Sequence, residues 1–305
     1  MKKEVNAIPD DLRVNPGRRV DLRKDFDPGY TGGFSKKEDT EELLVQGLSR
    51  LAEQQDMLYA QNTYALLIIV QALDAAGKDS TIRHVMSGVN PQGVEVTSFK
   101  VPSTEELDHD YLWRTNRVLP RRGNIGIFNR SYYEEVLVVR VHPELLDHEQ
   151  VPSHLKDKNI WERRFNEINC FENYVVDNGI IVLKFFLHVS HEVQKKRFIE
   201  RINEPEKNWK FSAKDVHERK FRDAYMAAYQ DMLNATSTPH APWYVIPADH
   251  KWYTRLAVTA IITDTLDRLK LSYPVVSSED KKALLAAKEE MEGEDGQGIV
   301  KKKKS

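Results

Sequence analysis

The sequence has little cysteine, no long apolar run and little net charge. Its single cysteine, Cys170, excludes a disulfide framework and a cysteine metal site, and fits a reducing cytosol. The longest apolar run covers residues 65–70, far below the roughly 20 residues of a membrane span, and the N-terminus shows no signal peptide pattern. A net charge of −2 excludes a globally basic nucleic-acid binder. We therefore expect a cytoplasmic protein without membrane or nucleic-acid partners.

Changes in composition indicate how the chain is organised. The 305 residues leave room for one large domain or two smaller ones, and 40% of them are hydrophobic, which allows a sizeable core. We predict an N-terminal surface arm over 1–40, a main domain over 41–275 and a charged tail over 276–305. The tail, which includes Lys301 to Lys304, is expected to be a frayed helix followed by solvated chain; the alternative is a tail that grips a polyanion.

Apolar strand patterns alternate with helical patterns along the main domain. Strands are predicted at 64–71, 94–99, 124–128, 180–187 and 242–246. Helical patterns fill the intervals, including single helices over 103–118 and 212–234. This alternation predicts an α/β fold in which helices cover both faces of a parallel, five-stranded sheet.

A small-residue turn with one Gly-Lys pair follows the first predicted strand. Buried strand, tight turn and helix N-terminus together form the layout of a phosphate-binding loop. Gly77 lets the backbone approach a phosphate closely, and Lys78 can stabilise charge on a transferring phosphoryl group. The match to G-x-x-x-x-G-K-S/T is imperfect, because Ala72 and Asp79 occupy the first Gly and the Ser/Thr positions. An ordinary turn with a surface lysine is the alternative interpretation.

A second polar group follows the third predicted strand. Ligands gather beyond the carboxyl ends of parallel strands, so this group and the loop are expected to share one crevice. Arg130 can bind phosphate oxygens in a fork geometry. Asn129 stands where many nucleoside triphosphatases have a metal-binding acid, which leaves Asp74 and Glu134 as candidate magnesium ligands. The alternative is a strand end followed by a capped helix with surface charges.

Two further basic groups are candidates for anion binding. Arg197 and Arg201 lie four residues apart, on one helix face, and Lys210 follows in a polar loop. Helix–loop–helix segments of this kind form lids over phosphates in nucleotide kinases, so we predict a lid over about 191–230. The alternative is a solvated helix pair, because acidic residues are interleaved. The other group could track a long anion or serve solubility, and consists of Lys100, Arg117, Arg121 and Arg122.

The segments DAAGKDSTI at 74–82 and FNRSYYEEVLV at 128–138 together resemble the polyphosphate kinase family 2. Lid-like segments at 196–201 and 208–212 and ADHK at 248–251 add to a resemblance that covers roughly residues 30–270. The resemblance implies a three-layer P-loop kinase fold with a helical lid. It also implies inorganic polyphosphate as phosphoryl donor or acceptor, magnesium (alternatively manganese) as cofactor, and a homo-oligomer, either dimer or tetramer.

The resemblance also implies roles for individual residues. Lys78 would contact the transferring phosphate, and Asp74 would organise magnesium between nucleotide and polyphosphate. Glu134 matches the pattern of the third class, which phosphorylates both AMP and ADP, whereas Asn129 departs from the aspartate of many members. Phosphate or nucleotide contacts would come from Arg130, Arg197, Arg201, Lys210, Ala75, Ala76, Gly77, Asp79, Ser80 and Asn129.

We therefore predict reversible, magnesium-dependent transfer of a phosphoryl group from polyphosphate to AMP and ADP. An ATP-dependent nucleoside or nucleotide kinase is the alternative enzyme, because its loop and lid would look much the same. A regulatory GTPase or ATPase module is a third hypothesis. The lack of an Asn-Lys-x-Asp motif and the residue Asn129 at the strand end argue against it.

Overall fold

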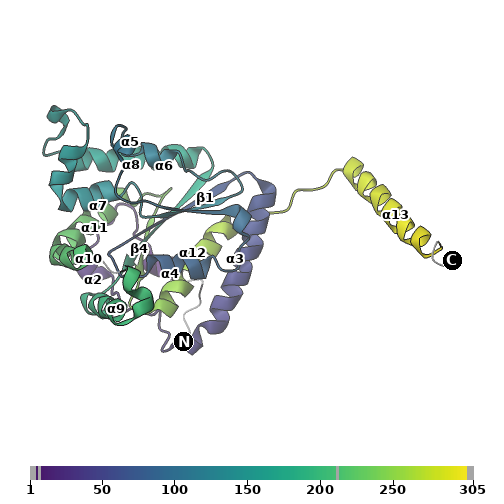
Figure 1. The fold of residues 1–305 in the computed structure, drawn as a ribbon, viewed down its shortest axis with the longest axis horizontal. Helices are drawn as coiled ribbons and strands as arrows, with labels where there is room; N and C mark the ends of the chain where they lie inside the picture. Colours follow the sequence, from purple (N-terminus) through teal and green to yellow (C-terminus); the bar gives the residue numbers. More distant parts are fainter. Residues whose placement is uncertain (1–4, 6–7, 211–212, 301–305) are drawn as a thin grey trace. The chain divides into compact units, whose positions relative to one another are not determined.

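The computed structural model describes residues 5, 8–210 and 213–300. The chain divides into two compact units, Met1–Leu271 and Ser272–Ser305. In the first unit five strands form one sheet in the order β2-β3-β1-β4-β5, and every neighbouring pair is parallel (Figure 1). The strands are β1 (Ala65–Ala72), β2 (Val94–Ser98), β3 (Ile125–Asn129), β4 (Ile180–His188) and β5 (Trp243–Pro247).

Helices cover both faces of the sheet, as Figure 1 shows. One layer contains α1 (Ile8–Leu12), α3 (Glu41–Gln61), α4 (Lys78–Val85) and α12 (Lys251–Arg268). The other contains α7 (Glu134–Val141), α8 (Ile160–Asp177) and α11 (Arg222–Thr236). The predicted α/β fold with a five-stranded parallel sheet and helices on both faces is confirmed.

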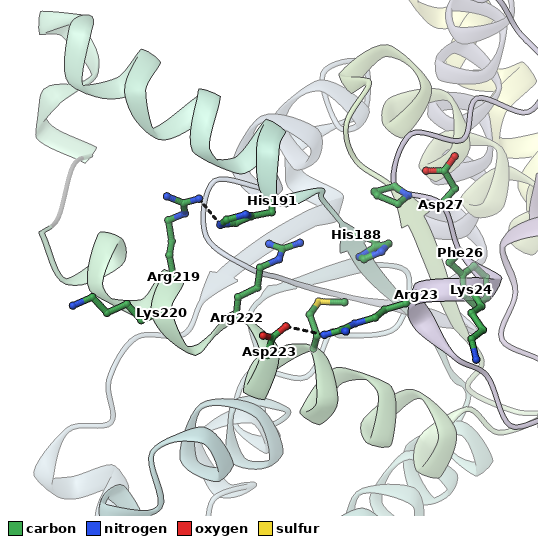
Figure 2. A pocket seen from close by; sticks show the side chains of 12 residues that line it. Arg23, Lys24, Phe26, Asp27, His188, His191, Arg219, Lys220, Arg222 and Asp223 are labelled. Carbon is green, nitrogen blue, oxygen red and sulfur yellow. Dashed lines mark hydrogen bonds and ion pairs between the residues drawn. The ribbon is translucent and has the colours of Figure 1, made fainter.

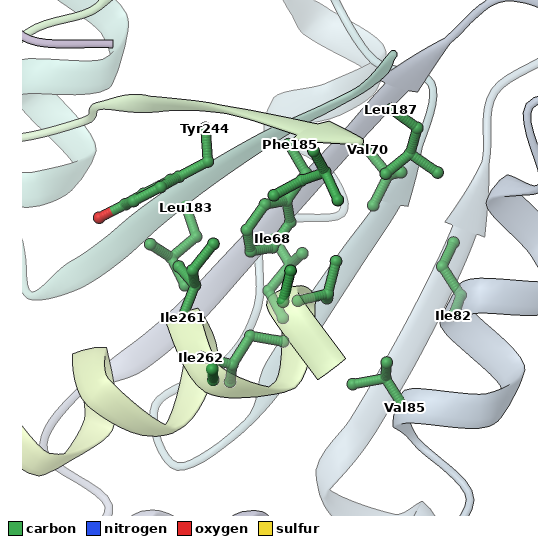
Figure 3. Packing of buried hydrophobic residues seen from close by; sticks show 14 of the residues in the cluster. Ile68, Val70, Ile82, Val85, Leu183, Phe185, Leu187, Tyr244, Ile261 and Ile262 are labelled. Atoms are coloured by element: carbon green, nitrogen blue, oxygen red, sulfur yellow. The ribbon is translucent and has the colours of Figure 1, made fainter. Parts of the chain in front are cut away.

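The central strand β1 explains why two separate cores form. All eight of its residues are buried, and successive side chains point to opposite faces of the sheet. Ile68 and Val70 join one apolar cluster, while Leu67 and Ile69 join the other. Ile82 of α4 belongs to the same cluster as Ile68 and Val70, and Figure 3 labels all three among the packed side chains. This packing directs the N-terminus of α4 to the carboxyl end of β1.

The N-terminal segment belongs to the first unit. The backbone N–H of Val14 donates to the carbonyl of Trp243 at 2.9 Å, and Arg13 forms an antiparallel bridge with Tyr244. Its buried apolar side chains, which the sequence did not indicate, are Ile8, Leu12, Val14, Val20, Leu22 and Phe34. In the second unit, α13 (Ser278–Val300) is a helix, and Lys301 to Lys304 lie outside the described residues.

Two helix predictions are wrong in extent. The segment 103–118 forms two short helices, α5 (Thr104–Leu107) and α6 (Trp113–Asn116), because the side chain of Asp110 accepts from the Leu112 N–H in a turn between them. The segment 212–234 is divided into α10 (Ala213–Glu218), η7 (Arg219–Phe221) and α11. None of the described helices is long and apolar enough to cross a bilayer.

His188, the last residue of β4, makes stability depend on pH. It is buried, and burial together with the charge of Arg222 lowers the pKa of its imidazole from 6.5 to about 4. Between these values the unfolded chain binds a proton that the folded chain does not, so the free energy of unfolding falls as the pH falls. The loss is expected to reach about 3 kcal/mol at pH 4.

Urea unfolding of the wild type and of His188→Gln at pH 7, 5 and 4 tests this expectation. The glutamine cannot titrate, so the variant should lose less stability than the wild type as the pH falls. Equal pH dependence in the two proteins would contradict the assignment to His188.

Candidate functional site

The loop between β1 and α4 has a strained backbone. Gly77 has a φ of 107° and Ala75 a φ of 61°, both in the region that L residues rarely adopt. A Cβ at position 77 would lie 3.4 Å from Ser80 Oγ, so glycine is required there for conformation more than for space. This geometry turns the chain tightly from the sheet edge into the first turn of α4, as a phosphate-binding loop requires.

Lys78 begins α4, and its side chain is buried beside the strand end. Its Nζ donates to the Ala72 carbonyl at 2.9 Å. Burial lowers the pKa of its ammonium, and the nearby carboxylate of Asp74 partly opposes this. Lys78 lines a cavity of about 810 Å³, which we call the loop cavity. Predicted site residues that share its lining are Asp74, Ala75, Gly77, Asp79, Ser80, Lys100, Asn129, Arg130, Arg197 and Arg201.

The end of β3 contributes a second strained residue. Arg130 has a φ of 65°, and its N–H donates to the Val70 carbonyl at 3.1 Å. Its guanidinium donates to Asp74 Oδ1 at 3.0 Å, which joins the two predicted groups across neighbouring strand ends. Outliers of this kind cluster at functional sites, where surrounding structure holds them in place.

Glu134 is the first residue of α7, four residues after Arg130. With its amide oriented to satisfy both neighbours, Gln71 donates from Nε2 to Glu134 Oε1 at 2.9 Å. Burial raises the pKa of the Glu134 carboxyl, although the charges of Arg130 and Lys78 oppose the shift. Glu134 and Arg130 also line a second cavity of about 270 Å³, the acceptor cavity, with the apolar side chains of Phe99, Val101, Pro102, Tyr111 and Val138.

Asn129 and Asp79 both line the loop cavity and are hydrogen-bonded to each other. Asn129 Nδ2 donates to Asp79 Oδ1 at 2.8 Å. Within the described residues, no group of three or more histidine, cysteine or acidic side chains could hold a metal. Magnesium, however, commonly takes one or two carboxylates and completes its shell with phosphate oxygens and water. The carboxylates of Asp74 and Asp79 in one cavity fit that requirement.

Arg197, predicted to hold phosphate, holds the loop backbone in this structure. From α9 (His191–Asn203) its guanidinium donates to the carbonyls of Ala76 at 2.7 Å, Ala75 at 3.2 Å and Ala248 at 2.6 Å. A fourth hydrogen bond goes to the carbonyl of Asp249. Arg197 is 8% exposed, and all four of these hydrogen bonds go to backbone carbonyls. Arg201 lines the loop cavity, and the side chain of Lys210 lies outside the described residues.

The four predicted channel residues are not brought together. Lys100 lines both the loop cavity and the acceptor cavity. Arg122 donates to carbonyls of Thr63 and Asn178, which precede β1 and β4 and therefore lie at the opposite edge of the sheet. Arg121 pairs with Glu95 at 3.6 Å, and Arg117 stacks on the ring of Trp113.

Some residues at the site were not predicted. Gln194 Nε2 donates to the Asp74 carbonyl at 2.9 Å, and Trp209 and Lys251 line the loop cavity. Partial burial and then the charge of Asp74 raise the pKa of the Asp215 carboxyl. The sequence could have indicated Gln194 by its spacing, because it lies three residues before Arg197 and therefore on the same helix face.

Comparison with known proteins gives a consistent result. The family model "Polyphosphate kinase 2" matches residues 34–273. An ADP-polyphosphate phosphotransferase of Rhodopseudomonas palustris is 50% identical over 92% of this chain and 97% of its own length. An AMP/ADP-polyphosphate phosphotransferase of Meiothermus ruber is 43% identical over 90% of this chain and 98% of its own length.

A solved structure supports the same relationship. The crystal structure of polyphosphate kinase 2 from Arthrobacter aurescens TC1 superposes with a TM-score of 0.83 at 38% identity, over 94% of this chain and 98% of that one. The predicted P-loop kinase fold is thereby confirmed.

Proposed function

Because the chain belongs to the polyphosphate kinase 2 family, we propose that it transfers a phosphoryl group from inorganic polyphosphate to AMP and ADP, reversibly. The observation that carries this is the junction of two cavities at Arg130. The loop cavity is charged and suits phosphate chains. The acceptor cavity is largely apolar and suits a nucleotide base, with Glu134 and Arg130 beside the nucleotide's phosphate end.

Positioning and charge neutralisation supply most of the catalysis in phosphoryl transfer. Lys78 and the backbone N–H groups of the loop would stabilise the transferring group, while Arg130 would hold the acceptor phosphate in line with it. Magnesium, held by Asp74 and Asp79, would neutralise charge on the phosphate oxygens. Arg197 keeps the loop in its strained shape, so that its N–H groups stay aimed at the phosphates.

The deciding experiment is a change of donor. The protein is incubated with magnesium and AMP or ADP, with either polyphosphate or ATP as donor, and the products are identified. Formation of ADP and ATP from polyphosphate supports the proposal. Transfer from ATP to AMP with polyphosphate inert would favour an ATP-dependent nucleotide kinase.

Two further measurements test the cofactor and the oligomeric state. Loss of transfer in EDTA, with recovery on addition of magnesium or manganese, would support the metal requirement. Light scattering measures whether the protein is a homo-oligomer.

Glu134→Asn is expected to impair AMP more than ADP as acceptor. Glu134 lines the acceptor cavity together with Arg130, which lines both cavities, and a single phosphate depends more on groups beside Arg130 than a diphosphate does. Loss of one charged hydrogen-bonding group predicts about a tenfold lower kcat/KM for AMP and a smaller loss for ADP. The exposed Glu144→Asn is the control, and equal losses on both acceptors would remove Glu134 from acceptor selection.

A further inference from the structure

A third cavity, of about 620 Å³, lies against the carboxyl end of β4 and shares no lining residue with the other two (Figure 2). We call it the basic cavity. Its walls come from α2 (Leu22–Asp25), the start of α9, η7 and the start of α11. The lining includes two aspartates, Asp27 and Asp223, and five positive side chains, which are Arg23, Lys24, Arg219, Lys220 and Arg222.

The guanidinium groups of this cavity are held in place. Arg222 donates from one nitrogen to the Val189 carbonyl at 2.7 Å, and Arg219 lies 2.7 Å from the ring of His191. Figure 2 shows the Arg219–His191 contact and the Arg23–Asp223 ion pair on the cavity wall. That ion pair is well exposed and therefore weak, so an anion can compete for Arg23.

His188 provides an independent sign of a ligand. It lines the basic cavity, is 6% exposed, and its buried Nδ1 has no hydrogen-bond partner within the described part of the chain. Buried polar atoms are nearly always paired, because an unpaired one costs free energy. The low pKa of about 4 keeps this ring neutral at pH 7, so it can donate one hydrogen bond.

The basic cavity is connected to the catalytic loop through one residue. Arg222 and Arg219 both donate to Oε1 of Gln194, at 3.3 and 3.4 Å. The other end of the same amide donates to the Asp74 carbonyl at 2.9 Å. A ligand that binds Arg219 and Arg222 would therefore change their hydrogen bonds to Gln194, which donates to the backbone carbonyl of Asp74.

We propose that the basic cavity binds a remote stretch of the condensed phosphate chain whose reacting end lies in the loop cavity. This inference rests on the proposed function. A chain with negative charge on every unit suits a cavity whose lining has five cations against two aspartates, and such binding releases counterions as nucleic-acid backbones do. The subsite makes the enzyme prefer long polyphosphate to short.

The test removes two exposed lysines from opposite walls, as Lys24→Gln/Lys220→Gln. Neither lysine touches the loop cavity. Calorimetric titration should show about fivefold weaker binding of long polyphosphate and a shallower salt dependence, with binding of tripolyphosphate unchanged. The KM for long polyphosphate should rise by the same factor, while the KM for AMP stays constant. The control, Lys195→Gln/Lys196→Gln, removes two exposed charges of α9 that line no part of the basic cavity.

Unchanged binding of long polyphosphate in the double variant would overturn the subsite. An equal loss for long polyphosphate and tripolyphosphate would also overturn it, because the effect would then act at the loop cavity. Binding is measured without turnover, so it reports on the subsite even if polyphosphate proves not to be a phosphoryl donor. That second failure would appear in the wild type, as absence of transfer at every chain length.

Discussion

Lys78→Ala is expected to abolish phosphoryl transfer and leave the fold intact. Lys78 is the cation at the N-terminus of α4, where loop N–H groups and the helix dipole already favour an anion. Removing one such group from a phosphoryl-transfer site costs at least about a hundredfold to a thousandfold in kcat.

Stability is expected to change little in this variant. The ammonium is buried, and burial lowers its pKa because desolvation disfavours the charged form. Alanine removes one hydrogen bond to the Ala72 carbonyl, worth about 1 kcal/mol, and also removes the buried charge.

Initial rates with polyphosphate and AMP, together with thermal melting, test both halves of this prediction. Lys195→Ala, an exposed lysine of α9, is the matched control. Near-normal activity of Lys78→Ala would show that the loop is not the phosphate site. Loss of folding would show instead that the buried ammonium is structural.

Glu172→Gln is expected to cost about 3–5 kcal/mol of folding free energy. Glu172 of α8 and Lys184 of β4 are fully buried, and their charged atoms lie 2.5 Å apart. Lys184 also donates to the Thr236 carbonyl at 2.7 Å. The glutamine leaves the ammonium without a counter-charge in the core, where burial already lowers its pKa.

The same change is expected to reach the active site. Glu172 accepts from the hydroxyls of Tyr132 and Tyr133, at 2.9 and 2.7 Å, and these tyrosines follow Arg130 by two and three residues. Loosening these tyrosines would release the strained turn that holds Arg130 beside Asp74. We expect kcat to fall together with stability.

Chemical denaturation and initial rates measure the two effects. The double variant Glu172→Gln/Lys184→Met removes both charges and is expected to recover much of the lost stability, since the methionine leaves no uncompensated charge in the core. A single variant as stable as the wild type would contradict the role assigned to this pair.

Much of the loop between β1 and α4 was predictable from local sequence. An apolar run, a small-residue turn and a Gly-Lys pair are contiguous, and the structure forms them as strand, loop and helix. The placement of Arg122 could also have been anticipated. It precedes β3, whereas Lys100 follows β2, and parallel strands put these positions at opposite edges of the sheet.

The sequence by itself determined the parallel sheet, the loop with Lys78 and the family, because these depend on periodicity and on motifs within a few residues. Only the tertiary structure decided that Arg197 donates hydrogen bonds to the loop carbonyls, that Lys184 pairs with Glu172, and that five cations line one cavity. Arg197 reaches a carbonyl 121 residues away. Contacts of that kind depend on how helices dock on the sheet, and the direction of a docked side chain is set by packing that no local pattern encodes.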